Sequence, residues 1–165
     1  MDTIQELFEH ELEDIYYAEH KLVTALDEMA TESTEAGVKR AFAEHKVQTE
    51  EHIRRLDQVF AALGKKPEGS KCDGIEGLIK EKKSFSREKP APQVLDLFNL
   101  GAGIKSERYE ISAYEGLISM ASALGLRDAQ PLLNANLREE EHALSTVQSL
   151  AKTAVKHNAG AAKSR

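Results

Sequence analysis

The feature of this 165-residue sequence that most constrains its fold is a glutamate in the middle of an apolar helical stripe. Residues taken at alternating steps of three and four predict the buried face of a helix. The stripe consists of Leu97, Leu100, Ile104, Glu107, Ile111, Tyr114, Ile118 and Ala121. A buried carboxylate carries a large desolvation cost unless it is protonated, paired or bound to a metal. Glu107 therefore predicts polar partners on other helices.

Three more segments have the same pattern, with polar residues near their centres. Helical periodicity predicts helices over residues 4–30, 35–63 and about 129–155, in addition to the helix over 92–124 that contains Glu107. The central polar residues are Glu19 in the first helix, His45, Thr49 and His52 in the second and Glu140 in the last. Every long helix thus offers at least one ionisable group to the interior.

The fold that these segments predict is all-α, a four-helix bundle with one long crossover. The crossover spans residues 64–92 and contains a short apolar cluster that predicts an extra helix over about 74–85. A connection of this length lets the helix after it start at the same end of the bundle as the helix before it. We expect residues 1–155 to form this single domain and residues 156–165 to be a flexible tail, because the periodicity ends there.

Composition limits the cellular compartment and the kinds of partner that we expect for this protein. No apolar run approaches the roughly 20 residues that span a bilayer, and the N-terminus does not resemble a signal peptide, so we expect a soluble, cytoplasmic protein without a membrane partner. Cys72 is the one cysteine, which excludes an internal disulfide and a thiolate zinc cluster. The net charge of -6 argues against a nucleic-acid partner.

The polar residues of the four stripes are expected to meet in one layer. Mid-helix positions of an antiparallel bundle share one height, and a boundary error of two residues moves a side chain by only ~3 Å. Carboxylates and histidines from four helices form the ligand set of di-iron and di-manganese bundles. Glu110, one turn from Glu107, adds a carboxylate to the adjoining face.

For the charged residues beside the stripes, the sequence favours exposure to solvent over a role as metal ligands. Glu139 and Glu141 flank Glu140 and are expected to face water, as charge runs usually do. His142 completes a Glu-x-x-His motif with Glu139, yet its own helical row is polar, which favours exposure. Whether His142 or Gln48 joins a metal site stays open at this point.

Several segments resemble one known family. They read DIYYAEHKL, AFAEH, RLDQVF, KCDGIEGLI, IKSERYEISAYEGLISMASALG and LREEEHA, and together they resemble the YciE/YciF family of bacterial stress proteins over nearly the whole chain. The resemblance implies a ferritin-like four-helix bundle with an extra connecting helix, often a homodimer, with metal-binding or ferroxidase-type activity. The matching site positions are Glu19, His45, Glu107, Glu110, Tyr114 and Glu140. The chain departs from the family at Gln48, where members often have a carboxylate.

Two hypotheses follow from these patterns. The first is a ferroxidase-type or peroxide-reducing protein with two iron ions, in which Tyr114 is a candidate catalytic group and oxygen or peroxide is the oxidant. Its expected metal ligands are Glu19, His45, His52, Glu107, Glu110 and Glu140. Manganese with catalase-like turnover is a variant of it. The second is a metal-free dimeric interaction protein whose polar layer is a hydrogen-bonded network that fixes helix register.

Overall fold

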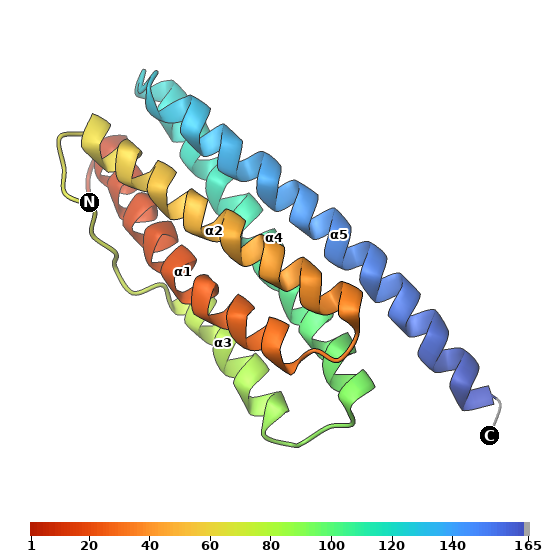
Figure 1. Cartoon of the computed structure of the whole chain (residues 1–165). Coiled ribbons are helices and arrows are strands. Elements are labelled where there is room, and N and C mark those ends of the chain that lie inside the picture. Colours follow the sequence, from red (N-terminus) through yellow and green to blue (C-terminus); the bar gives the residue numbers. More distant parts are fainter. Residues whose placement is uncertain (164–165) are drawn as a thin grey trace.

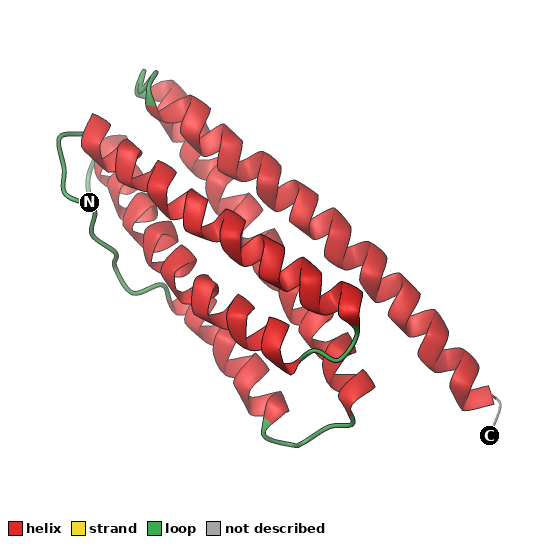
Figure 2. Cartoon of the chain, viewed as in Figure 1, coloured by secondary structure: helices red, strands yellow, loops and turns green. Residues whose placement is uncertain are grey.

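The computed structural model describes residues 1–163, including the side chains of residues 1–159. Within this range it contains five helices and no strand (Figure 2). The helices are α1 (Ile4–Glu32), α2 (Ala36–Ala62), α3 (Asp73–Ser86), α4 (Pro92–Ala123) and α5 (Ala129–Lys163). The prediction of an all-α fold is therefore confirmed.

Local sequence explains where several helices begin and end. Thr3 and Glu6 form a capping box at the start of α1, each satisfying a free amide of the other. Pro92 occupies the first turn of α4, where no amide donor is needed. Gly64 and Gly125 follow α2 and α4 with φ angles of 68° and 69°, a left-handed conformation that favours glycine. The next amide after each glycine then bonds back to the last helical turn.

The long helices pack around a common interior. α1 contacts α2 and α4, and α5 contacts the same two helices (Figure 1). α2 and α4 run in the same direction, because the crossover returns the chain to the end where α2 began (Figure 1). The crossover helix α3 lies outside, against α1 and α4. Each of the four long helices therefore runs antiparallel to the two long helices that it contacts.

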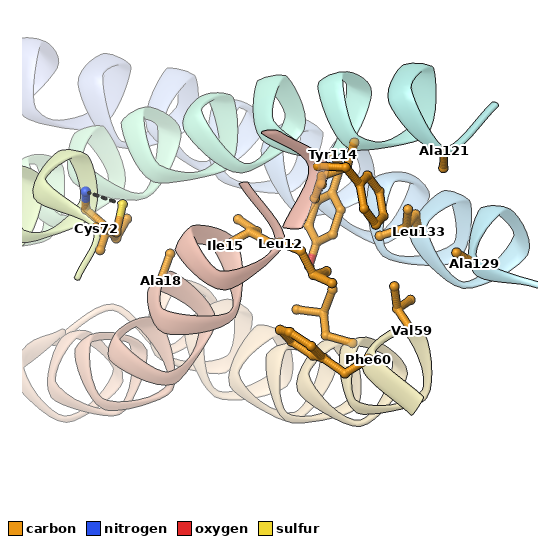
Figure 3. Close-up of a cluster of buried hydrophobic side chains, with 14 of the residues drawn as sticks. Leu12, Ile15, Ala18, Val59, Phe60, Cys72, Tyr114, Ala121, Ala129 and Leu133 are labelled. Atoms are coloured by element: carbon orange, nitrogen blue, oxygen red, sulfur yellow. Dashed lines mark hydrogen bonds between the residues drawn. The ribbon is translucent and has the colours of Figure 1, made fainter. Parts of the chain in front are cut away.

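Two hydrophobic clusters occupy the ends of this interior. One is built from the first two thirds of α1, the ends of α2 and α4 and the start of α5, and the start of α3 packs onto it. Figure 3 shows side chains of this cluster, with Leu12, Phe60 and Leu133 gathered near Tyr114. The second cluster joins the last turns of α1 to the start of α2, and includes Leu100 of α4. The central polar residues lie between the two clusters.

The crossover is fixed to the long helices by a partly buried tyrosine. Tyr109 of α4 donates a hydrogen bond to Asp14 (2.9 Å), and its hydroxyl lies 3.0 Å from the Cys72 sulfur at the start of α3. Gly74 allows this approach, because a Cβ there would stand 2.6 Å from the tyrosine ring. Cys72 is free and buried.

The last helix is longer than expected. We placed the end of the periodic segment at about residue 155, whereas α5 continues to Lys163. The added segment contains alanine and lysine, which favour helix, and Asn158 bonds back to the carbonyl of Ala154 (2.9 Å). Residues 164–165 of the expected tail lie outside the described range.

Within the described residues, no helix combines the length and apolar character needed to cross a membrane.

Candidate metal centre

The six predicted metal ligands are all buried and come from the four long helices. His45 is the most exposed of them at 6%, and each of the others is at most 1% exposed. They are Glu19 on α1, His45 and His52 on α2, Glu107 and Glu110 on α4 and Glu140 on α5. A concentration of carboxylates of this kind inside a small protein requires compensating charge.

Five of the six residues form two groups that share Glu140. Each group offers three donor atoms within 4.8 Å of one another. In the first, His52 Nδ1 lies 2.8 Å from Glu140 Oε1 and 3.4 Å from Glu19 Oε1. In the second, His45 Nε2 lies 3.3 Å from Glu140 Oε2 and 3.2 Å from Glu107 Oε2. Glu140 therefore directs one carboxylate oxygen toward each histidine.

The outer nitrogen of each histidine has a separate acceptor. His52 Nε2 lies 2.9 Å from Glu139 Oε2, and His45 Nδ1 lies 3.1 Å from Gln48 Oε1. Arg55 holds the Glu139 carboxylate through two hydrogen bonds of 2.8 and 2.9 Å. When the outer nitrogen donates its hydrogen, a neutral imidazole presents a lone pair on the inner nitrogen. This orientation is the one that histidine ligands of metals usually have.

Tyr114 closes one side of the centre. Its hydroxyl donates a hydrogen bond to Glu19 and accepts one from Asn136 Nδ2 (2.9 Å). The Asn136 side chain also contacts the backbone carbonyl of His52 (3.3 Å) and accepts a hydrogen bond from Arg55 (2.9 Å). A buried chain of polar contacts thus links Glu19 to the Arg55 guanidinium near the surface.

Glu110 is buried beside these groups without belonging to either of them. Its Oε1 atom has no hydrogen-bond partner among the described residues. Burial raises the pKa of Glu110 well above its ordinary value, and the charges of Glu140, Glu19 and Glu107 act in the same direction. Burial and the neighbouring carboxylates therefore favour the neutral form of Glu110 in the metal-free protein.

Burial and mutual charge set opposite protonation states within the centre. Burial, reinforced by the charge of Glu140, raises the pKa of Glu107 to about 8 despite the opposing charge of His45. Burial also disfavours ionised Glu140, but its close contacts with His45 and His52 outweigh it and hold its pKa well below the usual range. Burial alone would lower the pKa of His52, yet the charge of Glu19 and contacts with Glu140 raise it to about 10. Without metal, the centre therefore retains protons. Its histidines and carboxylates must release these protons when they bind a metal ion.

We expect the metal-free protein to lose stability as the pH rises from about 6 to about 9. His52 stabilises the fold fully below its unfolded pKa near 6.5, and this contribution is lost as the pH approaches about 10. Glu107 acts in the same direction, because the fold favours its neutral form and is penalised as the pH passes from 4.5 to about 8. Thermal unfolding of chelator-treated protein at the two pH values measures the effect.

The exposed histidine His142 provides a control for this pH dependence. The variant His142→Ala should show the same loss of melting temperature as the original chain, because the side chain is exposed. In a double variant, Glu107→Gln with His52→Gln, the melting temperature should change less between the two pH values. If it changed equally in all three proteins, the buried centre would not be the cause of the pH dependence.

Some contacts of the centre were not predicted from the sequence. Glu139 was expected to face water, but its carboxylate lies between His52 and Arg55 and is only partly exposed. Asn136 is fully buried, one turn before Glu140 on the same face. His142 is exposed, as its polar row indicated, and Gln48 contacts the His45 ring. The position of Asn136 four residues before Glu140 was the available signal for its burial.

Comparison with known proteins places the chain in a family. Residues 3–160 match the family model described as a domain of unknown function, DUF892. Protein YciF of Escherichia coli strain K12 is 36% identical over 142 residues, which is 86% of each chain. The chain belongs to the YciE/YciF family. The predicted resemblance is thereby confirmed.

Solved structures of family members have the same fold. The E. coli stress protein YciF superimposes with a TM-score of 0.90 at 34% identity, covering 94% of this chain and 99% of that one. YcfI from Rhodopseudomonas palustris, described as "a putative structural protein", gives a TM-score of 0.87 at 38% identity over 89% of this chain and 94% of its own. The YciE/YciF fold thus extends over nearly the whole of this chain.

Proposed function

We propose that this YciE/YciF family member is a ferritin-like four-helix bundle that binds two iron ions and reacts with oxygen or peroxide during bacterial stress. The observation that carries the proposal is the pair of three-ligand groups that share Glu140. Each group combines one imidazole with two carboxylates, a donor set that suits iron or manganese. The order of the helices, with one long crossover before α4, matches that of ferritin-like bundles.

The incomplete hydrogen bonding of the centre supports metal binding over a metal-free network. Among the described side chains, the buried atoms that form no hydrogen bond of good geometry include Glu19 Oε2, His52 Nδ1, Glu107 Oε2, Glu110 Oε1 and both Glu140 oxygens. The other contacts of His52 Nδ1, Glu107 Oε2 and the Glu140 oxygens are ion-pair distances of 2.8–3.4 Å between the two histidines and the carboxylates. Thr49, which a closed network would use, instead donates to the backbone carbonyl of His45 (3.0 Å). Buried carboxylates with incomplete hydrogen bonding are costly, whereas one cation in each group could be bound by several of them together.

Each ion would be held by its own pair of residues, with one further ligand common to both. Glu19 and His52 would hold one ion, His45 and Glu107 would hold the other, and Glu140 would serve both. Bound iron would supply one-electron redox chemistry toward oxygen or peroxide. Glu110 adds a carboxylate beside both positions. Hydrophobic clusters lie on both sides of the site along the bundle.

Tyr114 is the candidate catalytic group of this centre. Its hydroxyl donates to Glu19 and accepts from Asn136, so it can hold or pass a proton at the edge of the ligand set. Burial and the charge of Glu19 raise its pKa well above the ordinary value, which keeps the phenol protonated. A phenol that stays protonated and hydrogen-bonded retains the hydrogen atom that it could donate in a one-electron step.

We also propose a homodimer in the cytoplasm that engages neither membrane nor nucleic acid. The net charge of -6 and the free Cys72 support this setting. The crossover helix on the outer face favours a small assembly over a hollow shell. Light scattering checks the assembly, and a mass above about four subunits would contradict it.

The activity is tested with protein purified without a histidine tag. Anaerobic protein is loaded with ferrous iron and exposed to oxygen or peroxide, and the ferric absorbance is followed. We expect the absorbance to rise faster than in buffer, and Tyr114→Phe to slow it while iron binding is retained. Traces that coincide with buffer would exclude the ferroxidase reaction.

Metal analysis of the same preparation separates the remaining alternatives. About two iron ions per chain support the di-iron proposal. Manganese in their place, with release of oxygen from peroxide, would indicate the catalase-like variant. Absence of bound metal, even after incubation with ferrous iron, would favour a metal-free interaction protein. The description of YcfI as structural makes that last outcome the chief rival.

A further inference from the structure

A small cavity opens between α2 and α5 next to the proposed centre. Its volume is about 80 Å³, enough for water molecules or a partly hydrated ion. The lining includes Ala41, Glu44, His45, Gln48, His142 and Thr146. Two of these residues belong to α5 and four to α2, so the cavity follows the seam between the two helices that carry both histidines and Glu140.

His45 connects this cavity to the buried ligands. It lines the cavity and is the least buried of the six predicted ligands, while its Nε2 atom faces Glu107 and Glu140 at 3.2 and 3.3 Å. Gln48, another lining residue, holds the opposite nitrogen of the ring at 3.1 Å. An ion in the cavity would therefore lie one imidazole ring away from the centre.

The outer part of the cavity has metal donors that the buried centre does not use. Glu44 and His142 are exposed side chains on facing helices. Neither side chain forms a hydrogen bond or an ion pair with the described residues around it. A carboxylate and an imidazole that are free to move can replace part of the water shell of an incoming divalent ion.

We propose that this cavity is the port through which divalent metal ions reach the centre, with Glu44 and His142 as transient ligands at its mouth. The inference rests on the proposed metal-binding function and adds a route to it. The acidic residue raises the local concentration of cations, and the imidazole provides a second donor while water is removed. His45 then receives the ion as its first permanent ligand.

The port is tested by the rate at which metal-free protein takes up cobalt(II), followed by rapid-mixing absorbance. The double variant Glu44→Gln, His142→Ala should slow uptake by about tenfold at low salt, with less difference at high salt. The final amount of cobalt bound should equal that of the original chain. Glu115→Gln with His10→Ala makes the same changes at exposed positions outside the cavity, and should leave the rate unchanged.

A second variant tests the space rather than the charges. Ala41→Leu narrows the cavity and should also slow uptake, whereas Ala61→Leu makes the same change at an exposed position of α2. Unchanged rates in both cavity variants, with full cobalt binding, would overturn the port and leave the metal centre intact. A lower amount of bound cobalt in the Glu44/His142 variant would make these residues part of the centre instead. Failure of the original chain to bind cobalt or iron would overturn both proposals.

Discussion

Replacing Glu140 by glutamine is expected to remove both metal ions from the protein. Glu140 lies in both ligand groups, with Oε1 directed to His52 at 2.8 Å and Oε2 to His45 at 3.3 Å. Glutamine has nearly the same shape but carries no charge, and its amide nitrogen is a donor that cannot bind a cation. Metal analysis should therefore fall from about two ions per chain to nearly none, with the ferric reaction lost as well.

Single-site variants distinguish a shared ligand from an ordinary one. Glu19→Gln and Glu107→Gln each alter one group only, so each should leave about one ion per chain. Glu141→Gln makes the same change next to Glu140 at an exposed position, and should retain both ions. If Glu140→Gln retained one ion, the shared role of Glu140 would be wrong. If it retained two, Glu140 would not be a ligand.

The sequence predicted the inward direction of Glu19 and His52 well, because α1 and α2 each have one clear buried face. Glu19 and His52 lie on stripes whose apolar members, such as Leu12 and Leu56, are fully buried. The spacing therefore placed the ionisable groups correctly even though the helix ends moved by a few residues. Three turns of helix carry enough information to set the direction of a central side chain.

The prediction was less accurate on α4, which contacts three other helices. Ile104, Ile111 and Ile118 were expected in the core, but they are partly exposed. The buried face passes instead through Glu110 and Leu117. Because apolar residues are needed on several sides of this helix, its periodicity does not indicate a single inward direction.

The contacts that orient the histidines could not be predicted from one helix at a time. Arg55 and Glu139 each look like solvated surface residues, since each has charged neighbours in the sequence. Only the packing of α2 against α5 places them within 2.8 Å of each other and beside His52. Pairing between distant segments is a property of the fold, and periodicity within a helix does not contain it.

Replacing Glu107 by leucine is expected to stabilise the metal-free protein while removing one ion. Glu107 is 1% exposed, its Oε2 atom faces His45 Nε2 at 3.2 Å without a hydrogen bond of good geometry, and burial raises its pKa to about 8. Leucine fills a similar volume without that desolvation cost, and His45 keeps Glu140 as a charged partner. We expect a gain of about 1–3 kcal/mol in the free energy of unfolding.

The pH dependence of this gain identifies its cause. At about pH 9 Glu107 is ionised in the original chain, so the gain from leucine should be larger there than at about pH 6, where the carboxyl is already neutral. Denaturant unfolding of both proteins after chelation measures the difference, and Glu115→Leu provides the same substitution at an exposed position of α4. If Glu107 instead anchored a closed network, leucine would leave its partners unpaired and lower stability at both pH values. A destabilised variant with unchanged metal content would therefore favour the hypothesis of a metal-free hydrogen-bonded network. The two hypotheses are separated because replacing a metal ligand should stabilise the metal-free protein, whereas replacing a structural anchor should destabilise it.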